Sequence, residues 1–199
     1  GGTIGDQSVP LNNSINFNDC EMIFSASEMG TEGGSGVWPH GGTLDDWEIG
    51  EPLILSIDPP LTSENGMSVA GTDLTDNGYY NANEWAWFAS PAYEMRDPAM
   101  YDSVSVKIFK CLRNAPNDDT FIHMAFSDTD TPPDSSSSDW ILVRPYYGVN
   151  ETIWDYEVID LTNEFDTAWS LGRSYFFIRF IQSSGPFGER GGWNIDNIQ

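Results

Sequence analysis

Carboxylate side chains are the most abundant groups in this sequence that could perform chemistry. The chain has 31 Asp and Glu residues against 8 Lys and Arg, a formal net charge of −23. Calcium takes about six to eight hard oxygen ligands from carboxylates, amides and backbone carbonyls. Asp73, Asn81, Asn83 and Glu84 offer such oxygens in one short segment before an expected strand. They predict a bound calcium ion, unless Asp73 and Asn81 only cap turns by accepting backbone N–H groups.

Side chains that usually perform acid–base or nucleophilic catalysis are scarce. The only histidines are His40 and His123, and the chain has neither an H-E-x-x-H nor a G-x-S-x-G motif. We expect His123, inside an apolar run, to be a core or interface side chain, and His40, in a Gly-rich stretch, to be exposed. Carboxylate pairs suited to glycoside hydrolysis are unavoidable among so many acids and carry no information. The sequence therefore predicts no enzymatic activity.

Aromatic residues offer a second kind of chemistry, because flat exposed rings bind sugar faces and also anchor protein partners. The chain has 8 Trp and 8 Tyr residues. Trp85 and Trp87 alternate along an expected strand and so share one of its faces. Trp140 lies with further aromatic residues around an expected loop. We expect Trp85, Trp87 and Trp140 to contact a ligand; the alternative is that these rings fill the core.

Two cysteines and two glycosylation sequons bear on where the protein works. Cys20 and Cys111 are too few for a disulfide scaffold and lack metal-site spacing. In an exported protein they could form one disulfide, worth about 3–5 kcal/mol because it closes a long loop. Otherwise they are buried thiols that pack as small apolar groups. Asn12 and Asn150 each begin a glycosylation sequon, which agrees with export to an extracellular location.

The acidic composition excludes several kinds of partner. Nucleic acids and anionic membranes need clustered cations, and only two lysines, Lys107 and Lys110, are present. No apolar run approaches the roughly 18–20 residues of a membrane span, so membrane insertion is not expected. No basic-then-apolar leader opens the chain, which predicts a mature piece of a larger protein. The carboxylates favour either an acidic extracellular shell or a fold that needs cations to screen them.

These side chains need a scaffold, and the sequence predicts one made of short strands. The 19 Gly and 12 Pro residues are spread along the chain and are typical of turns, and helical periodicity is almost absent. Residues 25–43 are Gly-rich and polar and predict a long surface loop. Runs of β-branched and aromatic residues predict strands over 15–24, 53–57, 67–70, 84–89, 103–108, 120–126, 139–144, 152–160, 175–182 and 193–198. About nine to eleven strands without intervening helices predict an all-β, antiparallel two-sheet sandwich or a barrel.

The order of short motifs resembles a known type of module. Residues 47–52 (W-E-I-G-E-P) resemble the opening of MAM-type jelly-roll modules and of related modules attached to secreted metallopeptidases of the immune-inhibitor-A kind. Similar motifs follow at 71–81, 89–92, 101–106 and 154–162, and the last is G-W-N-I-D-N-I at 192–198. Two features depart from the pattern: Asn197 replaces a second acid, and a D-G-G-x-T-W hairpin is missing after Leu112.

The resemblance covers about residues 44–199 and implies one continuous jelly-roll domain. Residues 1–43 would supply an N-terminal strand and a Gly-rich loop that packs on the sandwich or leads to it. Modules of this architecture often hold a structural calcium or sodium ion near the last strand, which implies Asp73, Asn83, Asp102 and Asp196 as calcium ligands. The peptidase activity of the larger relatives is not expected in this segment.

These expectations describe a non-catalytic extracellular interaction or adhesion module of a larger secreted or cell-surface protein, stabilised by calcium. The expected partner is a protein or a glycan at the cell surface, or copies of the same chain. Two alternatives stay open. The first is a building block of a cell-surface filament or layer, in which residues 15–24 add to the edge of a neighbouring sheet. The second is a carbohydrate-binding accessory domain.

Overall fold

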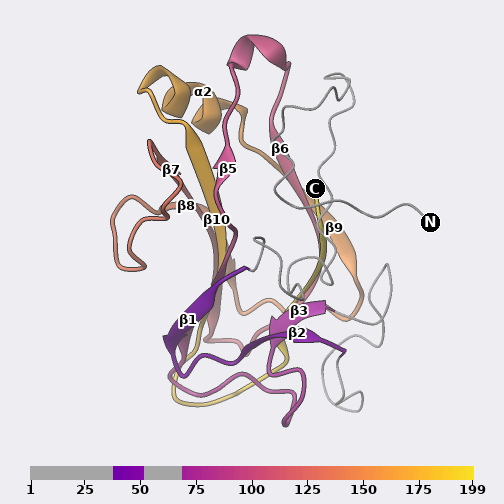
Figure 1. The fold of residues 1–199 in the computed structure, drawn as a ribbon. Helices are drawn as coiled ribbons and strands as arrows, with labels where there is room; N and C mark the ends of the chain where they lie inside the picture. The colour runs from indigo at the N-terminus through magenta and orange to yellow at the C-terminus, as the bar shows by residue number, and fades with distance from the viewer. Residues whose placement is uncertain (1–37, 52–68) are drawn as a thin grey trace, which may run out of the picture.

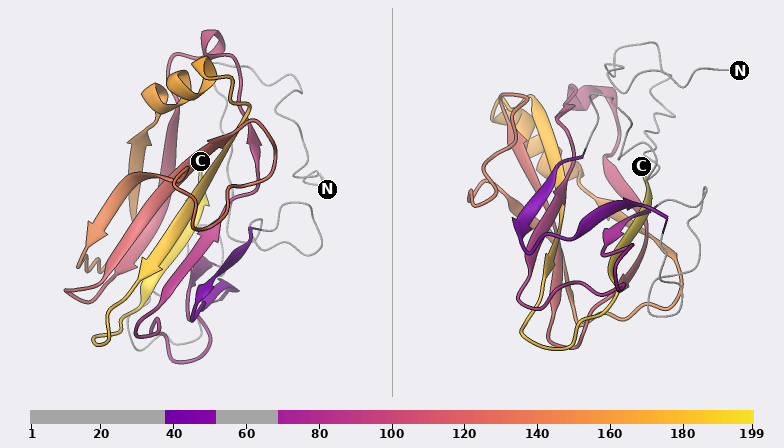
Figure 2. Two further views of the ribbon diagram at one scale, coloured as in Figure 1. Left: turned by 90° about the vertical axis from the view of Figure 1, so that its left-hand side faces the viewer. Right: turned by 60° about the horizontal axis from the view of Figure 1, so that its bottom comes forward.

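Two antiparallel sheets packed face to face form the body of the protein (Figures 1 and 2). The computed structural model describes residues 38–51 and 69–199. The strands predicted over 15–24 and 53–57, together with Asn12 and Cys20, lie outside these residues. Within the described ranges the predicted fold class, an all-β two-sheet jelly-roll sandwich with long loops, is confirmed.

Counting the described residues, one sheet has six strands and the other has five. The six-stranded sheet contains, in spatial order, β1 (His40–Thr43), β4 (Trp85–Ala89), β10 (Tyr175–Ser183), β7 (Asp119–Ser127) and β8 (Ile141–Tyr147), with β5 (Tyr93–Glu94) beside β10. The five-stranded sheet contains β2 (Trp47–Gly50), β3 (Val69–Thr72), β11 (Gly192–Ile198), β6 (Ser105–Arg113) and β9 (Asp155–Asp160). The 3-10 helix η2 (Pro98–Met100) and the helix α2 (Thr162–Ser170) lie at the top of Figure 1, and the segments after β3 and β10 lie at the bottom.

Each strand predicted between residues 67 and 198 overlaps an observed strand, but β1 was predicted as part of a surface loop. That prediction is wrong for His40–Thr43, which pairs with β4. An added Cβ at Gly42 would lie 2.2 Å from the Trp85 carbonyl oxygen, so the close approach of β1 needs a glycine. The glycines that suggested a loop are what allow this strand to pair.

The helix α2 is also absent from the sequence expectation. It buries Phe165 and Ala168 on one face, and its nine residues are too few to establish a helical period in the sequence. Phe165 packs edge-on against Phe126 of β7, with the ring centroids 5.3 Å apart. No helix within the described ranges is long and apolar enough to span a membrane.

The main core lies between the two sheets and follows the alternation of the strands. Phe180 of β10 and Ile122 of β7 belong to this core, and the Phe180 ring packs against Trp193 of β11 from the other sheet, with the ring centroids 5.4 Å apart. Trp38, just before β1, is 1% exposed and stacks on Phe88 at 5.1 Å. Residues 38–43, which the sequence placed before the jelly-roll domain, therefore belong to the sandwich.

The turn into β11 generates a testable prediction about this packing. Gly192 has a φ of 63°, and a Cβ there would lie 2.0 Å from Thr72 Oγ1. Gly172 has a φ of 78°, but nothing lies within 4 Å of its added Cβ. Gly172→Ala should lower the free energy of unfolding by about 1–2 kcal/mol through backbone strain alone. Gly192→Ala should lower it by about 3 kcal/mol or more, because overpacking adds to strain. Urea unfolding measures both, and equal losses would contradict the packing at β11.

Candidate functional site

Aromatic side chains line up across the outer face of the six-stranded sheet. The register places Trp87 of β4 opposite both Gly41 of β1 and Ile181 of β10, and it places Ile181 opposite Phe121 of β7. Because directly opposite residues of antiparallel strands share a face, these side chains form one row that crosses the strands. The Trp87 ring lies over Gly41, where an added Cβ would be 3.1 Å from Trp87 Cζ2.

A second row on the same face mixes aromatic and polar side chains. Thr43 lies opposite Trp85, Trp85 opposite Ser183, Ser183 opposite Asp119, and Asp119 opposite Tyr147. Trp85 is 36% exposed and Tyr147 is 65% exposed. We call Trp85, Trp87, Phe121 and Tyr147, with Ile181 between them, the aromatic face. Trp85 and Trp87 thus share an outward surface, as their alternation predicted.

Trp140 belongs to a different environment from the other two tryptophans. It is 9% exposed and packs with Ala125 and Phe177 in a small cluster outside the main core. Its indole N–H donates to the carbonyl oxygen of Asp134 at 3.1 Å. The segment between β7 and β8 passes over the outer face of the sheet (Figure 2, left) and covers this cluster. Trp140 therefore holds the segment on the sheet and does not present an open ring to a ligand.

A buried arginine connects this covering segment to the aromatic face. Arg179 of β10 is 4% exposed, and its guanidinium carbon lies 4.1 Å from the Trp140 ring centroid and 5.9 Å from that of Trp85. Nη1 donates to the Ser135 carbonyl oxygen at 2.8 Å, and Nη2 donates to His123 Nδ1 at 3.1 Å. Burial lowers the pKa of Arg179 to about 10, so the group stays charged at neutral pH. Within residues 38–51 and 69–199 no carboxylate forms an ion pair with it.

The histidines and the described cysteine are engaged in structural contacts. Burial and the Arg179 charge lower the pKa of His123 to about 4, so its imidazole is neutral and accepts from the guanidinium. His40 Nδ1 lies 2.7 Å from Asp45 Oδ2 at the surface. Burial and the charge of Glu151 raise the pKa of Cys111 to about 11. Cys111 is a free buried thiol, as in the alternative in which the cysteines pack as small apolar groups, and Cys20 lies outside the described residues.

A pair of buried carboxyl groups lies at the bottom of the sandwich. Asp46 follows β1, and Glu84 precedes β4 and is 2% exposed. The two carboxyl groups contact each other, and the Asn81 backbone N–H donates to Asp46 Oδ2 at 3.2 Å and to Glu84 Oε2 at 2.8 Å. Asp46 Oδ1 and Glu84 Oε1 are buried and accept no hydrogen bond from a described donor. We call Asp46 and Glu84 the carboxyl pair.

The electrostatics and the backbone around the carboxyl pair are both unusual. Burial raises the pKa of Asp46 and of Glu84, and each group also feels the negative charge of Asp45. Leu44, Asp73 and Asn83 have φ values of 59°, 46° and 59°, and they are the only described non-glycine residues with positive φ. Such conformations are costly and gather where the surroundings enforce them. The charge repulsion and the backbone strain therefore occur in the same group of loops.

The structure does not bring all four of the residues that the resemblance implied as calcium ligands to one place. The Asp73 carboxylate accepts the N–H groups of Asp76, Asn77 and Tyr79, as in the alternative in which it caps a turn. Asp102 follows η2 at the opposite end of the sandwich, and Asp196 is 1% exposed within β11.

Asn83, the fourth, lies next to Glu84 and donates its backbone N–H to the Gly185 carbonyl oxygen at 2.8 Å. No group of three or more His, Cys, Asp and Glu side chains in the described ranges is arranged to hold a metal. Sequence reasoning included Glu84 in an acidic segment but missed Asp46. The only signal was its position beside the W-E-I-G-E-P motif.

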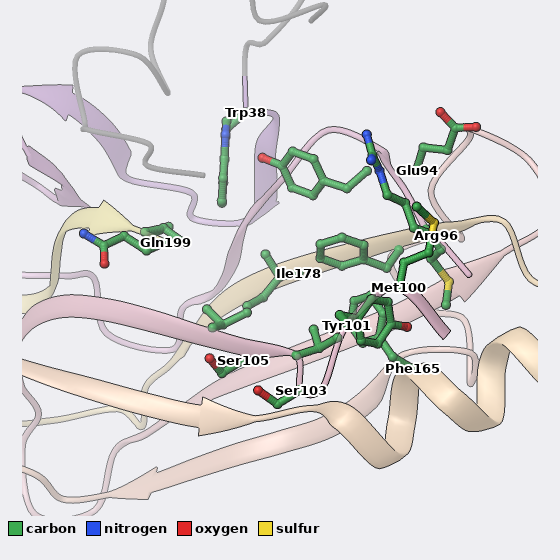
Figure 3. A pocket seen from close by; sticks show the side chains of 16 residues that line it. Trp38, Glu94, Arg96, Met100, Tyr101, Ser103, Ser105, Phe165, Ile178 and Gln199 are labelled. Carbon is green, nitrogen blue, oxygen red and sulfur yellow. The ribbon is translucent and has the colours of Figure 1, made fainter. Parts of the chain in front are cut away.

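A cavity of about 420 Å³ lies between the sheets beside η2 (Figure 3). Its walls are largely apolar and include Met100, Phe165 and Ile178. Glu94 and Arg96 are the charged residues of its described lining, which contains no histidine and no cysteine. A single carboxylate offers no paired groups for acid–base chemistry. The cavity is therefore a weaker candidate site than the aromatic face.

Solved structures with a similar fold include domains that bind other molecules. The K1 cleaved adhesin domain of Lys-gingipain from Porphyromonas gingivalis W83 aligns with a TM-score of 0.50 at 13% identity, over 89% of this chain and 96% of that domain. A structure of carbohydrate-binding modules from the β-sandwich superfamily aligns with a TM-score of 0.49 at 11% identity, over 81% of this chain and 56% of that chain. No protein-family model and no curated protein matches the sequence. The likeness to the K1 domain shows a β-sandwich fold and does not single out the MAM type.

The buried His123 gives a prediction about acid stability. A base with a lowered folded-state pKa stabilises the protein fully above its unfolded-state pKa, near 6.5, and the effect is lost as the pH falls towards 4. His123→Gln keeps a neutral acceptor for Arg179 and should remove this loss. The difference in free energy of unfolding between wild type and variant should therefore change between pH 7 and pH 4.5.

The exposed His40 supplies the control for this experiment. His40→Gln should leave the pH dependence close to that of wild type, and urea unfolding at each pH measures both variants. A wild type and a His123→Gln variant that lose stability in parallel on acidification would contradict a buried, neutral His123.

Proposed function

We propose that this chain is a non-catalytic extracellular binding module of a larger secreted or surface protein, and that it binds a glycan through the aromatic face. The observation that carries this proposal is the alignment of Trp85, Trp87, Phe121 and Tyr147 on the outer face of the six-stranded sheet. The outer face of a sandwich sheet usually carries polar side chains. Here Trp85 and Tyr147 are exposed, and Trp87 and Phe121 are half-buried beside them. Exposed aromatic rings on such a face are typical of a contact surface.

The spacing of the rings favours an extended sugar chain. β4 and β7 lie on either side of β10, so the backbones that carry these rings are about 10 Å apart across the strands. Two sugar units of one chain that crosses the strands could stack on Trp87 and Phe121, with Ile181 as the floor between them. In the neighbouring row, Ser183 and Asp119 lie between Trp85 and Tyr147 and offer hydrogen bonds to sugar hydroxyls.

The fold comparisons support a binding module only through the fold. The K1 domain of Lys-gingipain is named as an adhesin domain, and the β-sandwich modules are named as carbohydrate-binding. An adhesion role for this chain, and the MAM-type resemblance of residues 44–199, remain part of the proposal. A protein partner on the same aromatic face is an outcome that the glycan experiment distinguishes.

The edges formed by β8 and β9 do not favour the filament alternative. β8 is an edge strand of the six-stranded sheet, and it contains Pro145 and an irregular register beside Ile122 of β7. β9 is the edge strand on the same side of the other sheet and carries Asp155, Glu157 and Asp160. Proline, bulges and charges on edge strands discourage the addition of another strand. The filament alternative also requires residues 15–24 to add to a sheet edge, and this segment lies outside the described residues.

We further propose that a calcium ion stabilises the module at the carboxyl pair. The donor set fits a hard cation, because the carboxyl groups of Asp46 and Glu84 contact each other, and Asp46 Oδ1 and Glu84 Oε1 receive no hydrogen bond from any other described residue. Asp46 and Glu84 would hold the ion together with backbone carbonyls and water. Burial raises both pKa values because it disfavours the charged forms, and the charge of the ion would offset this cost; the ion would also pin the strained loops at Leu44 and Asn83.

Substitution of the exposed rings tests the glycan proposal. On a glycan array the wild type should bind at least one extended glycan, and Trp85→Ala and Trp87→Ala should each weaken that binding about tenfold or more. Trp169→Ala is the matched control, because Trp169 of α2 is 38% exposed, close to the 36% of Trp85, but lies outside the aromatic face. Titration calorimetry on the best glycan measures each affinity. An array without hits, or equal losses at Trp169, would contradict glycan binding.

Chelation and pH together test the calcium proposal. Chelator at pH 7.5 should lower the melting temperature, and added calcium should restore it by linkage to the folded state. A carboxyl with a raised pKa stabilises the fold most when protonated, so the chelated protein should become more stable as the pH falls from 8 towards 5. Glu84→Gln should remove most of the calcium response and reduce this pH dependence.

Asp102→Asn and Asp196→Asn are controls that distinguish this site from the ligand set implied by the resemblance. Both variants should keep the calcium response if the ion binds at the carboxyl pair. If Asp102→Asn or Asp196→Asn loses the calcium response while Glu84→Gln keeps it, the ion binds at a site other than the carboxyl pair. A wild-type melting temperature that does not change with chelator would contradict calcium binding altogether.

A further inference from the structure

A second surface feature lies between the helix α2 and the start of β8, away from the aromatic face. It is a groove of about 420 Å³ with apolar walls formed by Phe126, Ile141, Ala168 and Leu171. Two of these side chains are open to solvent, since Ile141 is 47% exposed and Leu171 is 71% exposed. Large aliphatic side chains that surround a groove are characteristic of a surface that binds another molecule.

The charged groups at the rim of the groove are predominantly acidic. Asp139 and Glu164 line it, and neither forms an ion pair with a cation of the described residues. Arg173 also lines it, but Arg173 Nη1 lies 3.8 Å from Asp128 Oδ1, which offsets its charge. The last turn of α2 carries no basic residue, so the negative end of the helix dipole is not compensated there.

We propose that this groove is a docking site for a cationic amphipathic segment of a protein partner. Aliphatic side chains of the segment pack on Ile141 and Leu171, and its Lys or Arg side chains pair with Asp139 and Glu164. The net charge of −23 steers a cationic segment towards the module from a distance. A second copy of this chain brings the same charge and is repelled. This site is independent of the aromatic face and of the glycan proposal.

The volume of the groove limits how the segment binds. About 420 Å³ accommodates a few aliphatic side chains and not a whole helix. Affinity therefore depends on a small number of buried contacts, with the acidic rim contributing mainly to the rate of association and to selectivity. We accordingly expect binding that weakens with added salt but still requires the apolar side chains.

A short fluorescein-labelled peptide, with Leu at helical spacing and Lys at the other positions, is the probe. Fluorescence anisotropy should show saturable binding to the wild-type protein. Leu171→Ser and Ile141→Ser should each weaken binding about tenfold. Ile153→Ser is the matched control, because Ile153 is 72% exposed, like Leu171, but does not line the groove. Glu164→Lys should also weaken binding, and melting temperatures should show that all four variants fold.

Two control peptides separate docking from general attraction to an acidic protein. Replacing every Leu by Ser keeps the charge, and replacing every Lys by Glu keeps the apolar face; both peptides should bind at least about tenfold more weakly. Binding of the Leu-to-Ser peptide as tight as that of the probe, or an equal loss in Ile153→Ser, would overturn the proposal. Sedimentation that shows a dimer dissociated by Leu171→Ser would assign the groove to a second copy and also overturn it.

Discussion

The register of β10 between β4 and β7 is the constraint on which the rest of the structure depends. β10 pairs with both neighbours, and alternate residues along it serve two different purposes. Phe180 and Ile178 face the other sheet and fill the core, whereas Ile181 and Arg179 face outward beneath the aromatic face. A slip of one residue would exchange the two sets, so the burial of the core also fixes the surface that is proposed to bind a ligand.

Arg179 holds the segment between β7 and β8 on the outward surface of the six-stranded sheet, where no described helix or further sheet packs. A buried cation needs hydrogen bonds or counter-charges, and Arg179 donates hydrogen bonds to the Ser135 carbonyl oxygen and to His123, with its guanidinium carbon 4.1 Å from the centroid of the Trp140 ring. The segment between β7 and β8 is thereby fixed on the sheet. Trp85 lies beside this hydrogen-bonded guanidinium, 5.9 Å from its carbon atom.

The two ends of the sandwich differ in what stabilises them. The end with α2 is closed by aromatic packing around Phe165, which needs no ion. The opposite end contains Asp46 and Glu84, whose burial is unfavourable while both carry charge, and the strained residues beside them. A proton, or the proposed calcium ion, would relieve the repulsion, so this end is where we propose that pH and that ion act on the stability of the fold.

The sequence by itself determined most strands and the faces of their side chains, because alternation along a strand is local and needs no knowledge of its neighbours. It placed Trp85 and Trp87 on one surface for this reason. Only the tertiary structure decided that Trp140 is covered, that β1 pairs with β4, and that Asp46 meets Glu84. Each of these depends on contacts between segments far apart in the chain, and no periodic pattern of residues encodes which loops will meet.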